Sequence, residues 1–419
     1  MLKLLVIADD FTGALDTGVQ FSNQGAKTLV ITEKDVVYET LATDVEVLVL
    51  NTESRHLSFA QTYDITQKII TQAQQANVPH IYQKVDSALR GNISAELQAI
   101  NDVTYQKIIP VIPAYPKMNR VVIDGNLYIG DDLVSDSVFA KDPYNPVTES
   151  NIIKRLKEEA NIEATLIQHG VLPPTAQGVC VFDTQTDDEL EQYASVLDKG
   201  GHLKISVGCA GFATVLARLL FPHQHSISYR LEQPIVVICG SVNPITKAQI
   251  DYLSAADFPR ISLTTKQLLD WQHWESDRGR TEIVRYLNLI NTHTLIAFET
   301  HSERTTNDII ALSKEATNDA TDYHSRIGES LGKLTRAFWQ AGCQGTFFFI
   351  GGDTLFQSMK ILGVESIEPV AEITSGVVLS KIEWNGRAIQ VITKSGGFGT
   401  KSLLTDINKL AENKEEKIK

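Results

Sequence analysis

The sequence of 419 residues contains few of the features that mark exported, membrane-spanning or redox-active proteins. Its four cysteines, Cys180, Cys209, Cys239 and Cys343, are far apart, with neither a CxxC pair nor the spacing of metal ligands. They are therefore predicted to be reduced core residues of a cytoplasmic protein. No apolar run approaches membrane-spanning length, and the first one, Leu4–Ala8, is too short for a signal-peptide core. We expect a soluble protein that is not exported.

Basic clusters with interleaved aromatic residues are also missing. The formal net charge is -13, so the overall field repels nucleic acids and anionic membranes. The HExxH motif of metalloproteases does not occur. We expect a small-molecule ligand and no nucleic-acid or membrane partner. An anionic ligand must then be met by a few local lysine and arginine residues.

What the sequence does contain is a regular alternation of apolar, β-branched stretches with helical stretches. This βαβ rhythm predicts an α/β fold in which mostly parallel sheets are flanked by helices. The predicted strands are Leu4–Ala8, Thr28–Ile31, Val45–Leu50, Ile81–Val85, Ile108–Ile112, Val179–Phe182, Leu203–Val207, Ile235–Cys239, Thr294–Phe298, Thr346–Ile350 and Ile389–Thr393. The predicted helices include Phe59–Gln75, which follows a Ser58 capping box, and Asp188–Leu197, Phe212–Leu220, Ile245–Ala255 and Tyr323–Gln340.

A polar, proline-containing stretch near the middle of the chain predicts a domain boundary. It contains Pro222 and Pro234, and a new apolar strand begins directly after it. With 43% hydrophobic residues the chain can bury two cores, so we predict a first domain at 1–228, a second at 234–410 and a charged tail at 411–419. The tail is expected to extend the last helix as a frayed end.

Two adjacent carboxylates end the first predicted strand. Asp9 and Asp10 follow it, and Thr17 with Gln20 forms a capping-box pattern that predicts the start of the next helix. Residues 9–13 would then form a turn at the carboxyl edge of the sheet, where ligands bind in open α/β folds. A purely structural turn and a ligand-binding turn are equally compatible with this segment alone.

A second polar segment concentrates charge at another strand end. Lys84 and Arg90 are suited to pair with a carboxylate, while Asp86 and Ser87 are suited to hydrogen-bond hydroxyl groups. Arg55 follows a further predicted strand and adds another positive charge. The alternative is a solvated loop that contains a lysine–aspartate ion pair.

In the second half, a hydrophobic strand runs into Gly351 and Gly352. Thr354 with Gln357 forms the pattern of a helix N-cap, which leaves Asp353 free to reach a metal ion or a hydroxyl group. The amides and the positive dipole end of a helix N-terminus favour an anion, and glycines let a phosphate approach the backbone. The alternative is an ordinary strand-to-helix turn.

Two further turns in the second half follow strands and precede helices. Gly396 and Gly397 lie in a glycine-rich turn that lacks the Gly-Lys step of a P-loop, so it indicates only a general phosphate cradle. Ser241 lies in a turn where Asn243 and Pro244 are typical N-cap and first-turn residues of a helix. Each turn has a structural alternative, and a nucleotide-binding role rests on the three turns together.

Six motifs in order, ADDFTGALDTGVQF, KVDSALRGN, IPAYPKMNR, GSVNPIT, GGDT and KSGGFG, closely resemble those of the four-carbon acid sugar kinases. The resemblance covers nearly the whole chain, from about Leu4 to Leu404. It implies a substrate-binding first domain, a nucleotide-binding second domain and an active site in the cleft between them. It also implies transfer of phosphate from ATP, with Mg2+, to the C4 hydroxyl of a tetronate.

The branch of the family is indicated by residues 15–20. This extension is more similar to the D-threonate and D-erythronate kinases than to the 3-oxo-tetronate 4-kinases, which remain the alternative within the family. The chain departs from the family pattern at two positions: Ala88 replaces a more usual hydroxyl residue, and Asn119 stands where a glycine precedes Arg120.

The resemblance also implies roles for individual residues. The acid sugar is bound by Asp10, Arg55, Lys84, Val85, Asp86 and Ser87, and ATP is bound by Ser241, Gly351, Gly352, Asp353, Thr354 and Gly397. We expect Gly396 to join the phosphate-binding turn. Arg55, Lys84 and Arg90 are expected to clamp the substrate carboxylate, and Asp10 is expected to orient or deprotonate the attacking hydroxyl.

Two functions of other classes stay open at this point. One is an NAD-dependent sugar-acid dehydrogenase, although no GxGxxG motif follows the first strand. The other is a non-catalytic sugar-acid binding protein, which would have no need of the glycine turns. The role of Asp9, the stereochemistry of the substrate, the metal ligands and the presence of a homo-oligomer are not determined by the sequence.

Overall fold

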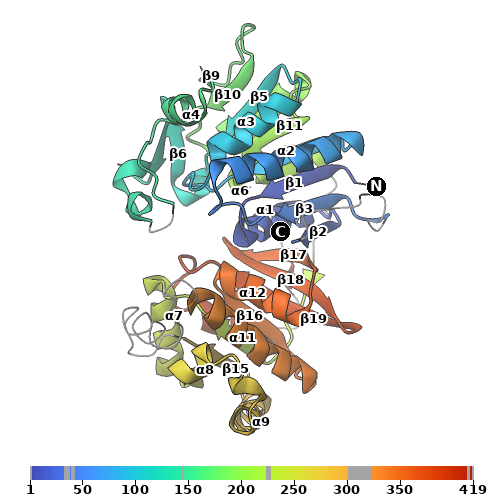
Figure 1. The fold of residues 1–419 in the computed structure, drawn as a ribbon, viewed down its shortest axis with the longest axis vertical. Helices are drawn as coiled ribbons and strands as arrows, with labels where there is room; N and C mark the ends of the chain where they lie inside the picture. Colours follow the sequence, from blue (N-terminus) through green and yellow to red (C-terminus); the bar gives the residue numbers. More distant parts are fainter. Residues whose placement is uncertain are drawn as a thin grey trace. The chain divides into compact units, whose positions relative to one another are not determined.

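The first half of the chain forms a sheet in which all neighbouring strands run parallel (Figure 1). The strand order is β2-β3-β1-β4-β11-β5-β10-β9. The strands are β1 (Leu4–Ala8), β2 (Thr28–Ile31), β3 (Val47–Asn51), β4 (His80–Lys84), β5 (Ile108–Ile112), β9 (Ala164–Ile167), β10 (Gly178–Phe182) and β11 (Ile205–Gly208). Every residue of β1 is buried. This burial explains the unbroken apolar sequence of β1, since a parallel strand covered on both faces has no polar side.

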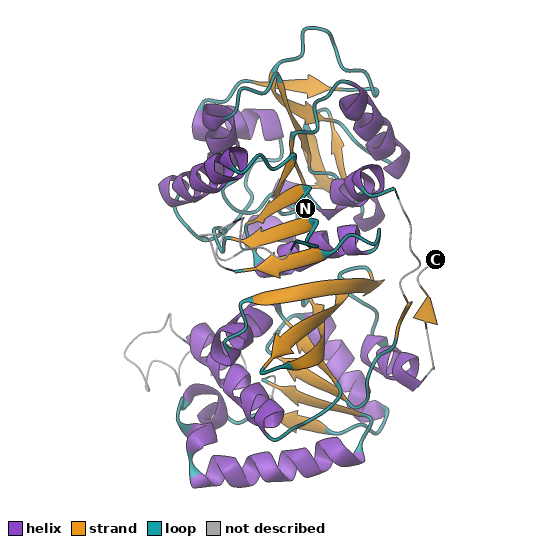
Figure 2. Cartoon of the chain, turned by 90° about the vertical axis from the view of Figure 1, so that its right-hand side faces the viewer, coloured by secondary structure: helices purple, strands orange, loops and turns teal. Residues whose placement is uncertain are grey.

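Helices lie on both sides of this sheet (Figure 2). They are α1 (Phe11–Ser22), α2 (Phe59–Gln75), α3 (Ile93–Val103), α4 (Ile152–Ala160), α5 (Asp187–Lys199) and α6 (Ala210–Leu220). Helix α1 packs against α6, and α2 packs against α3. The predicted capping box of α2 is present, because the Ser58 side chain accepts from the Gln61 amide and the Gln61 side chain accepts from the Ser58 amide.

A small antiparallel sheet interrupts the parallel pattern between β5 and β9. It consists of β6 (Arg120–Ile123), β7 (Asn126–Ile129) and β8 (Asp132–Leu133), with the 3-10 turns η2 (Pro116–Met118), η3 (Val134–Asp136) and η4 (Val138–Lys141) around it. These strands were not predicted from the sequence. They are short and mostly half-buried, so they lack the apolar runs that identify the central strands.

The second half forms its own sheet, with the strand order β14-β15-β13-β16-β19-β18-β17. The strands are β13 (Ile235–Cys239), β14 (Arg260–Ser262), β15 (Leu295–Glu299), β16 (Thr346–Ile350), β17 (Ser366–Thr374), β18 (Val377–Trp384) and β19 (Arg387–Lys394). The pairs from β14 to β19 are parallel, whereas β18 is antiparallel to both β19 and β17. The predicted parallel strands are confirmed, and the antiparallel strands β17 and β18 were not predicted.

The helices of the second half also lie on both sides of their sheet (Figure 2). They are α7 (Pro244–Ala255), α8 (Thr265–Leu269), α9 (Asp277–Thr292), α11 (Tyr323–Gln340), α12 (Gly352–Leu362) and α13 (Leu403–Glu412), with the 3-10 turn η5 (His273–Glu275). Helix α7 begins as predicted, with Pro244 at its first position and the Asn243 side chain accepting from the Ile245 amide at 2.9 Å.

The chain divides into two compact units, Met1–His225 and Ser226–Lys419. The computed structural model describes residues 2–32, 38, 43–142, 145–222, 228–300, 323–412 and 416–417. The predicted ligand-binding roles of the two halves are not tested by this division. In the described part, no helix is long and apolar enough to cross a membrane.

The C-terminal end of the chain differs from the expectation of a frayed helix. Helix α13 ends at Glu412, and Glu416–Lys417 forms a short strand, β20. This strand pairs antiparallel with β12 (Ser228–Tyr229). The expectation is therefore wrong at residues 416–417, where backbone pairing replaces a helical continuation.

Candidate active site

The carboxyl ends of three adjacent parallel strands bring together the polar segments of the first unit. Ala8, the last residue of β1, is paired with Asn51 of β3 and with Lys84 of β4. The segments that follow these strands therefore leave the sheet side by side. The residues that meet there are Asp9, Asp10, Arg55, Lys84, Asp86 and Arg90, and we call this group the charged cluster.

Arg55 is the centre of the charged cluster. Its guanidinium donates to both oxygens of Asp9, from Nε to Oδ2 at 2.7 Å and from Nη2 to Oδ1 at 2.9 Å. It also contacts Asp10, with Nη1 at 3.0 Å from Oδ2 and Nη2 at 2.7 Å from Oδ1. Arg55 is 8% exposed and Asp9 is 3% exposed. Asp9, whose role the sequence left undetermined, therefore fixes the orientation of Arg55 through a bidentate ion pair.

Arg90 is held by two further carboxylates. Its Nε and Nη2 each donate to Asp86 at 3.0 Å, and its Nη1 donates to Asp142 at 3.1 Å. Asp86 also accepts from the amide of Ala88 at 3.1 Å. Both arginines that were predicted to clamp a substrate carboxylate are thus engaged by carboxylates of the chain.

The first helix begins earlier than predicted. Asp10 is the N-cap of α1, and its Oδ1 accepts from the amide of Gly13 at 3.0 Å. The predicted helix start at a Thr17 capping box is wrong, because Thr17 lies inside the helix and is fully buried. Phe11 and Leu15, one helical turn apart, are buried in the core, and this packing favours a helix that already includes them.

Lys84 is the predicted substrate-binding cation that forms no ion pair with a described carboxylate. Its side chain is only 4% exposed, and within the described ranges no carboxylate lies at ion-pair distance from its Nζ. The ammonium lies beside the first turn of α1, since a Cβ built on Gly13 would stand 2.4 Å from both Lys84 Nζ and Asp10 Oδ1. An anion at this point would meet the ammonium and the positive end of the helix dipole.

Burial and charge act in opposite directions on the carboxylates of the cluster. Burial alone would raise the pKa of Asp10, but Arg55 and Lys84 lower this pKa below its ordinary value. Burial likewise opposes ionisation of Asp86, and Arg90 with Arg55 holds the pKa of Asp86 well below its usual range. Both groups are carboxylates at neutral pH, so Asp10 is a hydrogen-bond acceptor and a weak base.

Glu96 of α3 behaves in the opposite way. Burial is the largest influence on it, and the charge of Asp9 adds to that influence, so the pKa of Glu96 is raised well above its ordinary value. The side chain is 3% exposed and hydrogen-bonds to Gln83. A carboxyl group that favours its neutral form therefore lies next to the charged cluster. No sequence pattern marks Glu96 as buried, since a single glutamate on a helix is usually exposed.

Arg120 is a second residue that sequence reasoning did not assign to the site. Its Nη1 donates to the hydroxyl of Ser87. The guanidinium groups of Arg120 and Arg90 each lie 5.3 Å from the ring centre of Phe139 in η4. The preceding Asn119 adopts the left-handed conformation, with φ 51°. Glycine adopts this conformation readily, which fits the glycine of the family pattern at this position. Arg120 lies in one of the six motifs, but its partner Ser87 is 33 positions away, so no local pattern links the two residues.

The side chain of Val85 does not face the charged cluster. It is buried in the hydrophobic core, and its amide donates to the carbonyl of Gly208 at 2.9 Å. Cys209 is also structural, because its Sγ contacts the Pro113 carbonyl oxygen at 3.1 Å and burial raises its pKa to about 11. A buried thiol of this kind is a poor nucleophile.

In the second unit, the carboxyl ends of β13, β16 and β19 bring the three glycine turns together. Cys239 of β13 is paired with Ile350 of β16, and Ile350 is paired with Lys394 of β19. The turns that follow are in direct contact, because a Cβ on Gly396 would lie 2.3 Å from the Ser241 hydroxyl oxygen. The predicted ATP-binding residues in these turns are Ser241, Gly351, Gly352, Asp353, Thr354, Gly396 and Gly397, and we call this group the glycine edge.

The N-terminus of α12 lies in the glycine edge. Gly351 is the N-cap, with φ 111°, a conformation that favours glycine, and it makes no side-chain cap. Thr354 was predicted to be the N-cap, and this is wrong, since Thr354 is a buried residue inside the helix. Asp353 lies in the first turn and is exposed. The first amides of α12 are left without a side-chain acceptor, which suits an anion.

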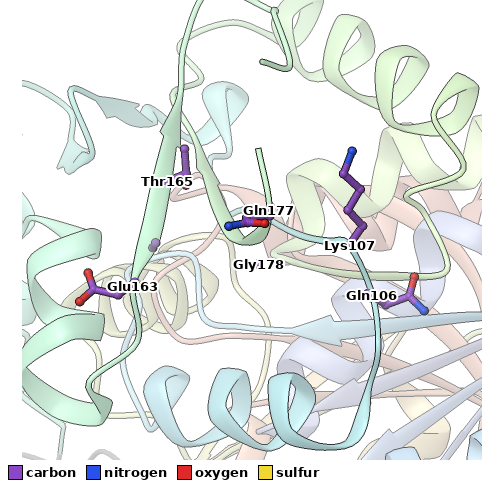
Figure 3. Close-up of a pocket in the computed structure, with 7 residues that line it drawn as sticks. Gln106, Lys107, Glu163, Thr165, Gln177 and Gly178 are labelled. Carbon is purple, nitrogen blue, oxygen red and sulfur yellow. The ribbon is translucent and has the colours of Figure 1, made fainter. Parts of the chain in front are cut away.

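A surface pocket of about 510 Å³ lies elsewhere in the first unit (Figure 3). It is lined by Gln106, Lys107, Glu163, Ala164, Thr165, Gln177 and Gly178. Lys107, Glu163 and Gln177 directly precede β5, β9 and β10, so the pocket lies at the amino edge of the sheet. None of the predicted site residues lines it. In open α/β sheets ligands bind at the carboxyl edge, so we assign the candidate site to the charged cluster and not to this pocket.

Each half of the chain matches a family of known proteins. Residues 4–216 match the family described as "Sugar-binding N-terminal domain", and residues 236–404 match "Nucleotide-binding C-terminal domain". A D-threonate kinase of Salmonella typhimurium is 28% identical, with 97% of both chains covered. A D-threonate kinase of Bordetella bronchiseptica is 29% identical, with 95% of both chains covered.

A solved structure supports the fold independently. The crystal structure of a Haemophilus influenzae protein assigned to DUF1537 superposes with a TM-score of 0.73. The alignment covers 97% of this chain and 100% of that one, at 20% sequence identity. The likeness therefore extends over both sheets.

Proposed function

The chain belongs to the four-carbon acid sugar kinase family, and we propose that it transfers the γ-phosphoryl group of ATP to the C4 hydroxyl of D-threonate or D-erythronate. The observation that supports the proposal is the presence, in one chain, of two unlike sheet edges whose polar groups suit an anion. The sugar-binding half contains Lys84 beside the start of α1, and the nucleotide-binding half contains the glycine edge.

Lys84 is the group best placed to bind the substrate carboxylate. Its ammonium lies next to the first turn of α1 and forms no ion pair among the described residues, although Asp10, Asp86 and Glu96 are near enough to feel its charge. The arginines of the charged cluster are engaged by aspartates, so their role is to hold those aspartates in fixed positions for the hydroxyl groups. We expected Arg55, Lys84 and Arg90 to bind the substrate carboxylate together, and we now propose Lys84 as its main cation.

Asp10 is proposed to accept a hydrogen bond from the attacking C4 hydroxyl. Because its pKa is lowered, Asp10 stays ionised and orients the hydroxyl, and it takes the proton only as the bond to phosphorus forms. Phosphoryl transfer depends mainly on positioning and charge neutralisation, so a weak base is sufficient. Replacement of Asp10 by Asn should lower kcat about 100-fold or more, the contribution typical of a general base.

The glycine edge is proposed to bind the phosphates of ATP. Amides of the first turn of α12 and of the turn at 396–399 supply donors for the phosphate oxygens. Mg2+ typically binds to substrate phosphates and one or two carboxylates, and it neutralises charge on the transferred group. Asp353 fits a single-carboxylate role, since it is exposed in this edge and no described residue bonds to its carboxylate.

An ATP-consumption assay tests the proposal directly. The panel contains D-threonate, D-erythronate, their L forms and 3-oxo-tetronates, with product analysis for the 4-phosphate. Turnover of a 3-oxo form alone would move the chain to that branch of the family, and no turnover on any compound would reject the kinase assignment. Reduction of NAD by the same acids would indicate a dehydrogenase. Tetronate binding without ATP binding in calorimetry would indicate a binding protein.

A further inference from the structure

A buried lysine lies behind the glycine turn that follows β19. Lys394 is 2% exposed, and its Nζ donates to three carbonyl oxygens of that turn. The acceptors are Ser395 at 3.0 Å, Gly396 at 3.2 Å and Phe398 at 3.1 Å. In the part of the chain that the structure describes, no carboxylate forms an ion pair with Lys394. Backbone carbonyls therefore solvate this ammonium in place of water or a counter-ion.

Two side chains of α7 hold the same turn. Thr246 Oγ1 donates to the carbonyl of Gly396 at 2.8 Å. Gln249 Nε2 donates to the carbonyls of Phe398 at 3.0 Å and Thr400 at 2.9 Å. The carbonyls of Gly396 and Phe398 thus each have two donors, which matches the two lone pairs of a carbonyl oxygen. The inner side of the turn consists of carbonyl groups with fixed directions.

These carbonyl directions determine the directions of three amides. In a planar trans peptide, the C=O of one residue and the N–H of the next point in opposite directions. Since the carbonyls of residues 395, 396 and 398 point toward Lys394, the amides of Gly396, Gly397 and Gly399 point away from it. Amides that face one side of a turn form a concave site for an anion.

The two adjacent glycines of this turn have different surroundings. A Cβ on Gly396 would lie 2.3 Å from Ser241 Oγ, so packing requires glycine there. A Cβ on Gly397 would have Asn243 Nδ2 at 3.8 Å as its nearest described neighbour, which is an ordinary contact. Packing does not explain glycine at 397. A ligand that approaches the backbone does explain it.

We propose that Lys394 is a positioning residue that turns three glycine amides toward the phosphates of ATP. The identity of the ligand rests on the proposed function, whereas the orientation of the amides follows from the contacts above. Lys394 does not take the place of a P-loop lysine, which contacts phosphate directly. It acts from the opposite side of the turn and adds a positive charge beneath the anion.

The charge of Lys394 is sensitive to pH near neutrality. Burial lowers its pKa to about 8. Burial raises the pKa of Cys239 to about 12, so this thiol stays neutral when Lys394 titrates. The remaining contacts of Lys394, from α7 and from the turn, are a hydroxyl and carbonyls that do not titrate. A rise in pH through about 8 should therefore weaken nucleotide binding.

The test compares the Lys394→Met variant with the control Lys401→Met. Lys401 is exposed a few residues away and lies over the Tyr252 ring instead of under the turn. Calorimetry with Mg-ADP should show at least a tenfold rise in Kd for Lys394→Met, because a charged hydrogen-bond donor is lost, and less than a twofold change for Lys401→Met. The KM for the acid sugar should change less than twofold in both. Between pH 7.5 and 9.5, Kd for the wild type should rise, whereas that for Lys394→Met should not.

A folded Lys394→Met protein whose Kd for Mg-ADP stays within twofold of the wild type would overturn the inference. If this variant does not fold, Gly397→Ala decides, because its Cβ would meet only an ordinary contact within the protein but would stand where the ligand approaches the backbone, and an unchanged Kd for Mg-ADP overturns the inference equally. A wild type that binds Mg-ADP but phosphorylates no acid sugar contradicts the proposed function and leaves the role of Lys394 intact.

Discussion

At the carboxyl edge of the first unit, side chains of opposite charge hold one another, whereas at the carboxyl edge of the second unit the backbone carries the polar groups. Arg55 lies between Asp9 and Asp10, and Arg90 lies between Asp86 and Asp142. Behind the glycine edge, the buried ammonium of Lys394 contacts carbonyl oxygens instead. Removal of one charged side chain should therefore leave its partner unpaired in the first unit. Removal of Lys394 should loosen the turn that follows β19 in the second.

The largest expected effect is the loss of Arg55. The Arg55→Met variant leaves the buried Asp9 and the half-buried Asp10 without their main cation, which should lower the free energy of unfolding by about 3–5 kcal/mol. The loss should shrink at acidic pH, where Asp10, no longer held ionised by Arg55, takes up a proton. Urea denaturation at pH 7 and pH 4 measures both effects.

The matched control for Arg55 is an exposed ion pair of the second unit. Arg278 pairs with Glu282 at 3.0 Å, and its side chain is 73% exposed. Arg278→Met should therefore cost less than about 1 kcal/mol at either pH. An Arg55→Met protein that is as stable as this control would show that the charged cluster is solvated and not a buried network.

A smaller effect, mainly on binding, is expected for Lys84. The Lys84→Met variant breaks no ion pair among the described residues but removes a positive charge near Asp10 and Asp86, so the free energy of unfolding should fall less than for Arg55→Met. The KM for the acid sugar should rise about 10- to 100-fold, because a charge-assisted bond to the substrate carboxylate is lost. Steady-state kinetics with each substrate varied in turn checks this. A larger change in KM for ATP than for the acid sugar would contradict our assignment of Lys84.

The parallel strands were predictable because burial on both faces leaves a direct mark on the sequence. The strands Leu4–Ala8, Ile108–Ile112 and Ile235–Cys239 were predicted with the bounds that the structure shows, and each is an unbroken buried run. The antiparallel strands β17 and β18 alternate in burial over part of their length and lie between recognisable elements. Alternation of this kind is itself a signal of a half-buried strand, so β17 and β18 could have been predicted from the sequence and were missed.

The sequence predicted which residues gather at the two sheet edges, but it did not predict how their charges pair. Strand ends and glycine turns identified Asp10, Lys84 and Gly396, since parallel strands end at one edge. Which charges neutralise one another depends on contacts between distant positions, such as Arg90 with Asp142, and no local pattern records them. The N-caps at Thr17 and Thr354 were wrong for the same reason, because tertiary burial selected an earlier helix start in both cases.

Glu96 gives the finest test of the comparison between the two edges, because Glu96 near the first edge and Lys394 near the second both have a pKa that is shifted toward the neutral form. The folded state raises the pKa of Glu96, so its proton is bound more tightly in the native state than in the unfolded chain. The stability that this proton contributes is complete below the unfolded pKa and is lost as pH rises through the folded pKa. Glu96→Gln keeps the shape and a neutral side chain at every pH.

The stability of Glu96→Gln should therefore equal that of the wild type near pH 4 and exceed it increasingly as pH rises toward 8, by at most about 1.4 kcal/mol per pH unit. Urea denaturation across this range measures the difference, with Glu158→Gln on the exposed face of α4 as the control. A difference that stays constant with pH would mean that Glu96 is ionised in the folded protein. The first unit would then contain only charged carboxylates around Arg55, and the contrast with the partly neutralised Lys394 of the second unit would become sharper still.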